Sequence, residues 1–204
     1  MPSQTKRVYF GDYMFVVDEN VYEPAEDSFL FAENLELHVG ERVLDMGTGC
    51  GILGIVSAEK ASAVVAVDVN PYAVRCAKEN AILNNVRGKM AFVQGDLLTP
   101  LNGKAKFDVI LFNAPYLPAD ENERGSWLDL AWSGGTSGRQ VIDRFISEAP
   151  GHLKQTGRVL LTQSTLANVN KTKHKFSKSG FSTKVVAECA LPFFEKITLI
   201  EATT

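Results

Sequence analysis

The segment from Val43 to Gly51 constrains the fold of this chain more than any other. It reads Val-Leu-Asp-Met-Gly-Thr-Gly-Cys-Gly and runs into an apolar stretch with helical spacing. The pattern predicts a buried strand, a tight turn and a helix, because glycine lets the backbone approach a ligand and a helix start presents unpaired N–H groups. Gly49, Gly51 and Gly54 also spell GxGxxG, a dinucleotide-binding pattern that is a weak indicator by itself.

Strands and helices alternate along the rest of the chain. Hydrophobic spacing predicts strands at residues 42–46, 63–67, 90–94, 107–112, 157–162, 181–190 and 196–202. It predicts helices at residues 26–37, 51–60, 71–84, 139–153 and 166–179, and a hairpin from residues 7–10 and 13–17. Repeated strand–helix units predict an α/β fold with a mostly parallel sheet, helices on both faces and two final strands that pair antiparallel.

Size and composition narrow the class of protein. The 204 residues are expected to form one domain, because they suffice for a single sizeable core and no linker or repeat interrupts them. A net charge of −3 argues against binding of nucleic acid by phosphate neutralisation. Cys50, Cys76 and Cys189 lack metal-ligand spacing, so we expect reduced thiols, no metal site and a cytoplasmic protein. No apolar run approaches the ~20 residues of a membrane span.

Three acids lie at the ends of three successive predicted strands, beside the glycine turn. Asp45 precedes the glycines, where a carboxylate suits an ammonium or sulfonium group better than a pyrophosphate. Asp68 can accept hydrogen bonds from ribose hydroxyls, although Asn70 is the better cap for the helix that begins at Pro71. Asp96 either joins this set or caps a loop. Together the acids fit S-adenosylmethionine (SAM), which carries a sulfonium, an amino group and a ribose diol.

The sequence Asn113-Ala114-Pro115-Tyr116 follows the apolar run of residues 107–112. A parallel strand ending here would place the carboxamide of Asn113 at the edge of the sheet where open α/β folds bind ligands. The amide offers one acceptor and two donor hydrogens, Pro115 fixes φ, and Tyr116 supplies a flat apolar wall. These features suit a planar NH2 group, while an ordinary strand-end turn is the alternative.

Four motifs carry a resemblance that covers nearly the whole chain. They are Val21–Ser28 (VYEPAEDS), the glycine turn, residues 113–116, and Ala131–Arg139 (AWSGGTSGR). In that order they resemble class I SAM-dependent methyltransferases, and within them the archaeal and eukaryotic branch of HemK-like glutamine N5-methyltransferases of peptide-chain release factors. The first and last motifs are the most specific.

The resemblance implies a fold and a set of site residues. The fold would be a Rossmann-like, doubly wound, seven-stranded sheet with a C-terminal antiparallel strand, and residues 1–38 would form a hairpin and helix that pack on the cofactor site. The expected cofactor-binding residues are Ser28, Asp45, Gly47, Gly49, Asp68, Asp96, Leu97 and Asn113. The expected catalytic residues are Asn113, Pro115 and Tyr116.

The resemblance also implies partners. The substrate would be a release factor with a Gly-Gly-Gln motif, and a small zinc-binding activator subunit would form a heterodimer with this chain. In this fold the predicted strand of residues 89–94 is the edge of the sheet, so we expect the activator to dock there by strand addition.

One position departs from the family pattern. The family has Asn-Pro-Pro-Tyr, and here the first proline is Ala114. Alanine keeps the backbone carbonyl, so Asn113 Oδ1 and the Ala114 carbonyl could each accept one N–H of a target amide, while proline's rigidity is lost. Tyr116 would stack on the amide, and no strong base is needed.

Three other functions stay open at this point. An N6-adenine methyltransferase of nucleic acids grips a planar amine with a similar motif, but it needs basic surface and an extruded base. A lysine methyltransferase must deprotonate an aliphatic amine, which the asparagine motif suits poorly. A non-catalytic SAM-binding subunit is the third, and Ala114 is the one residue that hints at it.

Overall fold

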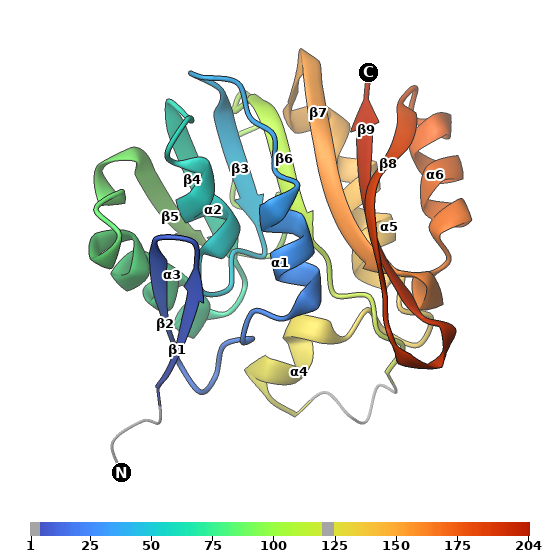
Figure 1. The fold of residues 1–204 in the computed structure, drawn as a ribbon. Coiled ribbons are helices and arrows are strands. Elements are labelled where there is room, and N and C mark those ends of the chain that lie inside the picture. The colour runs from blue at the N-terminus through green and yellow to red at the C-terminus, as the bar shows by residue number, and fades with distance from the viewer. Residues whose placement is uncertain (1–4, 120–124) are drawn as a thin grey trace.

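The computed structural model describes residues 5–119 and 125–204, which are built around a seven-stranded sheet of order β5-β4-β3-β6-β7-β9-β8 (Figure 1). Its strands are β3 (Arg42–Met46), β4 (Ala63–Asp68), β5 (Met90–Gln94), β6 (Phe107–Asn113), β7 (Leu153–Ser164), β8 (Ser182–Ala190) and β9 (Lys196–Thr203). The ladders from β5 to β7 are parallel, and β9 is antiparallel to both β7 and β8. The predicted mostly parallel sheet with a C-terminal antiparallel strand is therefore confirmed.

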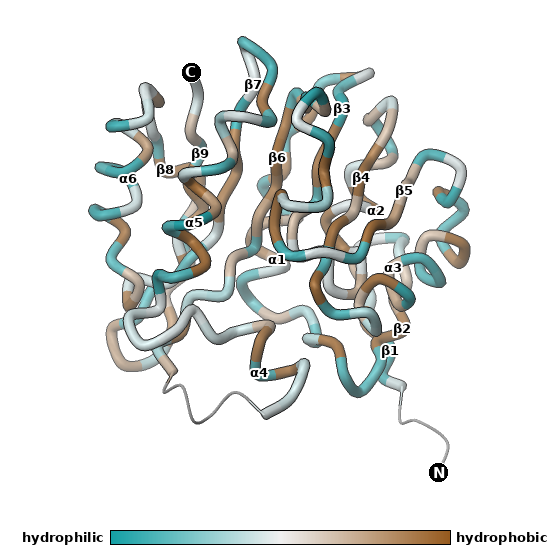
Figure 2. The backbone as a smooth tube through the Cα atoms, turned by 180° about the vertical axis from the view of Figure 1, so that it is seen from behind, coloured by the Kyte–Doolittle hydropathy of each residue, from teal (hydrophilic) through white to brown (hydrophobic). Residues whose placement is uncertain are grey.

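Helices cover both faces of this sheet. They are α1 (Glu26–Glu33), α2 (Ile52–Ser57), α3 (Pro71–Leu83), α4 (Trp127–Trp132), α5 (Gln140–Glu148) and α6 (Val169–Lys178). In Figure 1 α1, α2 and α3 lie in front of the sheet, and Figure 2 shows α5 and α6 on the opposite face. None of the described helices combines the length and apolar character that a membrane crossing requires.

The central strand β6 shows how the sequence builds a sheet that is covered by helices on both faces. Successive side chains of a strand point to opposite faces. Val109 and Leu111 therefore join the core under α1–α3, whereas Ile110 and Phe112 join the core under α5 and α6. Because both faces are covered, β6 reads as a continuous apolar run with a single acid, Asp108.

The predicted hairpin forms from β1 (Lys6–Phe10) and β2 (Tyr13–Val17). Asn80 of α3 and Asn84, which caps the end of this helix, dock the hairpin by bonding to the β2 backbone. Asn80 accepts from the Val16 N–H (2.9 Å) and donates to its carbonyl (3.0 Å), and Asn84 does the same at Met14 (3.1 and 2.8 Å). Asn80 also donates to the Cys50 carbonyl (2.8 Å), so the hairpin is tied to the glycine turn.

Some element boundaries differ from the predictions. The first helix ends at Glu33, although Leu37 still packs in the core from the segment that follows the helix. The helix predicted over 139–153 gives way at Glu148 to a short 3-10 turn, because Pro150 lacks an N–H and β7 begins at Leu153. The helix predicted over 51–60 is α-helical only over 52–57.

Candidate functional site

A cavity of about 580 Å³ opens at the carboxyl ends of the parallel strands. It lies where the strand order reverses between β3 and β6, which is the usual ligand position in open α/β sheets. All four sequence motifs reach its wall. Of the predicted site residues, the structure brings together Ser28, Gly47, Gly49, Asp68, Asp96, Leu97, Asn113, Pro115 and Tyr116.

The glycine turn is shaped by backbone geometry and fixed by Asp68. Gly47 and Gly49 have φ of 64° and 55°, a conformation that residues with a side chain adopt only with strain. The Gly49 N–H donates to Asp68 Oδ2 (2.9 Å), and the Asn70 N–H donates to Asp68 Oδ1 (2.9 Å). Burial raises the pKa of the Asp68 carboxyl above its usual value, and these two hydrogen bonds offset only part of that rise. Asn70 caps α3 as predicted.

Asp45 lies outside the cavity wall, which the sequence did not predict. It is buried beneath the turn, where its Oδ2 accepts from Thr48 Oγ1 (2.6 Å) and from the Gly54 N–H (2.9 Å). Its Oδ1 accepts no hydrogen bond from the part of the chain that the structure describes. Burial raises the pKa of this carboxyl to about 7. In this structure Asp45 organises the turn, because both oxygens face protein and not the cavity.

Gly54 allows this close packing of α2 on Asp45. A Cβ at Gly54 would lie 2.7 Å from Asp45 Oδ2 and 2.9 Å from the Met90 methyl carbon. Both separations are well inside van der Waals contact. The last glycine of the GxGxxG pattern thus serves helix packing, and no side chain fits in its place.

Asp96 combines the two roles that the sequence left open. Its backbone carbonyl accepts from Thr99 Oγ1 (2.6 Å) and closes a turn, while its side chain reaches the cavity rim and pairs with Arg144. Arg144 is the only Lys or Arg among the described wall residues, and it also approaches Glu148 (3.6 Å). An acidic wall without a free cation suits a sulfonium nucleoside and disfavours a pyrophosphate.

The carboxamide of Asn113 is fixed at one end and unpaired at the other. Its Nδ2 donates to Asp27 Oδ2 (3.2 Å) and to Ser28 Oγ (3.2 Å). Its Oδ1 is buried and has no hydrogen-bond partner among the described residues. A buried acceptor without a donor is costly, and this one belongs to a residue that lines the cavity, so a ligand N–H that reached it would remove that cost.

Asp27 is the site residue that sequence reasoning missed. It is 5% exposed and accepts five hydrogen bonds. The donors are Tyr22 OH, the Ser28 N–H and Oγ, Asn113 Nδ2 and Tyr116 OH. Burial and the charge of Asp27 raise the pKa of Tyr22 and of Tyr116, which keeps both phenols neutral donors. The signal was present, because Asp27 belongs to the specific Val21–Ser28 motif.

Ala114 makes a contact that proline could not make. Its N–H donates to the Thr162 carbonyl (3.4 Å) and extends the pairing of β6 with β7, in which Asn113 lies opposite Thr162. The side chain of Ala114 is buried. The neighbouring strand therefore restrains the backbone at the position where the family has a rigid ring.

The loop after α4 interlocks with the segment that contains Asn113. The Leu117 N–H donates to the Trp132 carbonyl and the Gly134 N–H donates to the Leu117 carbonyl, both at 2.9 Å. Gly138 has φ of 67°, and a Cβ there would lie 2.3 Å from the Tyr116 carbonyl oxygen. The motifs at residues 113–116 and 131–139 therefore form one unit at the cavity, and α4 lies at its edge.

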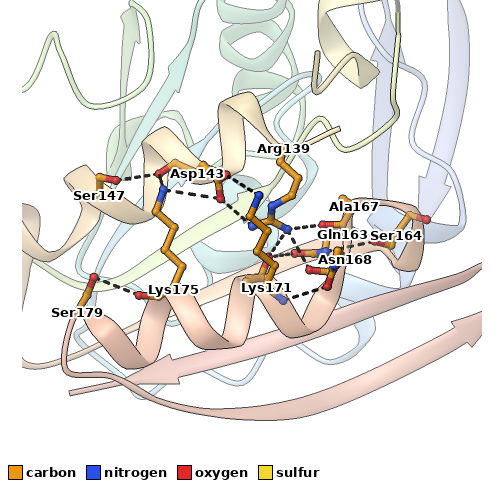
Figure 3. Close-up of polar contacts among 11 residues, drawn as sticks. Arg139, Asp143, Ser147, Gln163, Ser164, Ala167, Asn168, Lys171, Lys175 and Ser179 are labelled. Carbon is orange, nitrogen blue, oxygen red and sulfur yellow. Dashed lines mark hydrogen bonds and ion pairs between the residues drawn. The ribbon is translucent and has the colours of Figure 1, made fainter. Parts of the chain in front are cut away.

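Arg139 anchors this unit to α6 (Figure 3). Its guanidinium is buried and donates to the carbonyls of Ala167 and Asn168, to Thr172 Oγ1 (2.9 Å) and to Asp143 Oδ1 (2.7 Å). This cation resists movement, because loss of Asp143 would leave a buried charge unpaired and loss of a neutral acceptor would leave a buried N–H without a partner. The glycine loop thus has a rigid end at Arg139.

Cys50 lies on the cavity wall but is a poor nucleophile. Burial raises the pKa of its thiol, and nucleophilic attack requires the thiolate. In the described residues, no group of three or more His, Cys, Asp or Glu side chains could hold a metal ion.

Comparison with known proteins agrees with this geometry. Residues 15–130 match the family model described as "Methyltransferase small domain". A protein of Methanocaldococcus jannaschii that carries the name of a protein N5-glutamine methyltransferase is 46% identical over 184 residues, which are 89% of this chain and 91% of that protein. The release factor glutamine methyltransferase of Deinococcus radiodurans is 35% identical over 77% of this chain, which spans 59% of that protein.

Solved structures share the fold. The E. cuniculi Mtq2–Trm112 complex, described as responsible for methylation of the termination factor eRF1, superposes with a TM-score of 0.69 at 23% identity over 91% of this chain and 99% of that chain. The T. thermophilus 16S rRNA methyltransferase RsmC, solved with AdoMet and guanosine, gives 0.73 at 20% identity over 99% of this chain and 50% of that chain. This chain belongs to the methyltransferase small domain family, and its relatives include glutamine N5-methyltransferases of release factors.

Proposed function

We propose that this chain methylates the side-chain amide nitrogen of a glutamine in a translation release factor, within a Gly-Gly-Gln motif, and that SAM is the methyl donor. The observation that carries the proposal is the unpaired, buried Oδ1 of Asn113 on the cavity wall. A primary amide supplies the N–H that this acceptor lacks. The relatives named as glutamine methyltransferases support the same substrate class.

The cofactor would occupy the part of the cavity beside the glycine turn. When bound, SAM supplies an electrophilic methyl group on a sulfonium. Asp68 would accept from the ribose hydroxyls with the lone pairs that Gly49 and Asn70 leave free. Gly47, Gly49, Asp96 and Leu97 would line the pocket, and Ser28 would close it. Asp45 would act from beneath, because it holds the turn and does not reach the cavity.

The target amide would be held by two acceptors, Asn113 Oδ1 and the Ala114 carbonyl. An amide nitrogen is a weak nucleophile because its lone pair is delocalised into the carbonyl. Each acceptor would take one N–H and aim the nitrogen into the cavity. As the nitrogen takes the methyl group and the carbon–sulfur bond breaks, the nitrogen becomes positively charged, so both hydrogen bonds would strengthen in the transition state. The extra proton would leave to solvent afterwards.

Asp27 would position Asn113 without acting as a base. Its oxygens already accept five hydrogen bonds, and the one from Asn113 Nδ2, together with the bond from Asn113 Nδ2 to Ser28 Oγ, would fix the orientation of the carboxamide. Tyr116, also held by Asp27, would present its ring to the planar amide, and Pro115 would fix the backbone between them. Orientation and charge stabilisation carry the rate in this proposal.

The variant Asn113→Ala tests the proposal. We expect its turnover to fall by about 10²–10³-fold, the usual cost of one transition-state hydrogen bond, while its affinity for SAM in calorimetry changes less than twofold. Near-normal turnover would show that Asn113 has no catalytic role. Methyl transfer from SAM to release factor, nucleic acid and histone, measured side by side, separates the glutamine enzyme from an adenine or lysine methyltransferase. Transfer to none of them, with SAM still bound, would indicate a non-catalytic subunit.

We also propose that β5 docks a small zinc-binding activator subunit in a cytoplasmic heterodimer. β5 pairs with β4 alone among the described strands, so its other edge is free for strand addition. The Mtq2–Trm112 complex shows that a protein of this fold assembles with a partner. Replacing Phe92 with proline would remove a backbone donor from the edge strand and should abolish co-purification with a co-expressed activator.

A further inference from the structure

The turn between β8 and β9 presents two phenylalanines to solvent. Phe193 and Phe194 are 97% and 103% exposed, more than any other large apolar side chain among the described residues, of which Val39 follows at 88%. Both have φ in the left-handed region, 61° and 64°, which is unfavourable for bulky residues. Two rings displayed at the cost of backbone strain call for an explanation beyond stability.

This turn is fixed close to the candidate site. The carboxylate of Glu195 accepts from Ser164 Oγ (2.5 Å) at the end of β7, and the Lys196 N–H donates to Thr165 Oγ1 (3.1 Å). The charge of Glu195 also helps to raise the pKa of Tyr116, so the turn lies within electrostatic reach of the residues that flank Asn113. In Figure 1 the turn lies at the same edge of the sheet as α4.

Other exposed apolar side chains lie at this edge. Leu128 and Leu130 of α4 are 38% and 39% exposed, and Leu166, directly after the residue that holds the turn, is 55% exposed. Leu130 is also part of the cavity wall. We call Leu128, Leu130, Leu166, Phe193 and Phe194 the apolar rim. Exposed apolar side chains at the same edge as a cavity, one of which lines it, indicate an occupant that is larger than the cavity itself.

The charges at the cavity select the class of occupant. Asp27, Asp68 and Asp96 line it, and the one wall cation, Arg144, is paired with Asp96. A nucleic acid needs unpaired cations to neutralise its phosphates, and these described residues provide none. A free amino acid would enter the cavity without needing Phe193 and Phe194, which do not line it. A folded protein that inserts one side chain and lays apolar surface beside it fits both features.

We propose that Phe193 and Phe194 form a docking element for the protein substrate. They bind an apolar patch next to the loop that carries the target glutamine, and they hold the substrate while its side chain enters the cavity. This inference rests on the proposed function. It assigns to the β8–β9 turn the recognition of the folded substrate, separately from recognition of the amide.

The test is the double variant Phe193→Asn/Phe194→Asn, in which asparagine suits the left-handed backbone. Its substrates are intact release factor and a short peptide that contains only the Gly-Gly-Gln loop. We expect KM and the Kd for intact factor to rise about tenfold or more, because aromatic anchors dominate protein interfaces. We expect unchanged kcat, SAM affinity and peptide kinetics. Val39→Asn is the matched control, since it removes a similarly exposed apolar side chain and should change nothing.

Several results would overturn the docking role. An unchanged Kd and KM for intact factor would do so, as would an equal loss on factor and peptide, which indicates damage to the site. A loss of self-association in sedimentation with unchanged KM would assign the turn to a second copy of this chain. Failure of the unmodified protein to methylate either substrate would refute the proposed function instead, and the Kd comparison would still decide the docking role.

Discussion

The two halves of the cavity are built in different ways. The half at the glycine turn is made of backbone, from the consecutive segments β3, α2 and β4, and Asp45 and Asp68 secure it from inside. The half at Asn113 is made of side chains from segments far apart in sequence, joined through Asp27. The half at the glycine turn should therefore lose its geometry when backbone packing is disturbed. The half at Asn113 should lose its geometry when one side chain is removed.

The largest expected effect is in the side-chain half. Asp27→Ala would remove the acceptor of Tyr22 and Tyr116 and one of the two acceptors of Asn113, so Ser28 alone would hold the Asn113 amide and its orientation would be poorly fixed. We expect kcat to fall about 100-fold or more, with SAM affinity changed less than threefold. Steady-state kinetics and calorimetry measure the two. Asp12→Ala, at an exposed acid of the hairpin turn, is the control; turnover near the unmodified level would show that Asp27 does not position the amide.

At the glycine turn we expect a substitution to reduce SAM affinity and stability. Gly54→Ala would force a methyl group to within 2.7 Å of Asp45 Oδ2, so the turn or α2 must shift. We expect SAM affinity to fall about tenfold and the free energy of unfolding to fall by about 1–3 kcal/mol. Gly88→Ala is the matched control, because nothing lies within 4 Å of a Cβ there. Equal behaviour of the two variants in urea unfolding would contradict this view of the turn.

The pH dependence of stability sharpens the comparison. Burial raises the pKa of Asp45 to about 7 in the folded protein, while the unfolded value is about 3.9. Between these values the folded state binds more protons, so the contribution of Asp45 to stability falls as pH rises from 4 to 7. Relative to Asp45→Asn, the unmodified protein should lose about 2 kcal/mol between pH 5 and pH 7.5 in urea titrations. If the stability of both proteins changed with pH in the same way, that result would be evidence against a raised pKa of the buried Asp45 carboxyl.

The smallest effect is expected at Ala114. Ala114→Pro restores the family residue and rigidity, but it removes the N–H that bonds to Thr162. The two changes oppose each other, so kcat should change by less than about threefold. A change of tenfold or more in either direction would show that one of the two restraints dominates the geometry of Asn113.

The sequence predicted the parts of the molecule that local patterns control. Apolar runs located every strand of the main sheet, and the glycine turn and the Asn70 cap followed from short-range chemistry. The role of Asp27 was not predictable in this way, because it lies 86 positions from Asn113 and only tertiary packing brings them together. The same holds for Asp45, whose place beneath the turn depends on how α2 packs.

Two secondary-structure errors have local causes. Apolar spacing does not predict α4, because this helix is short, although Ser126 and Asp129 form a capping box, which is a start signal present in the sequence. The first helix was extended to residue 37 because Leu35 and Leu37 continue the apolar spacing. Those leucines pack against the core from a segment that is no longer helical.

The unpaired carboxamide oxygen of Asn113 affects how many methyl groups one glutamine can accept. A primary amide brings two N–H groups to two acceptors, but the product of a single transfer retains only one. In the proposed arrangement that product could bond to only one of Asn113 Oδ1 and the Ala114 carbonyl, and it would place its new methyl group against the other oxygen. The arrangement therefore favours release of the monomethyl amide and discourages a second round on the same nitrogen.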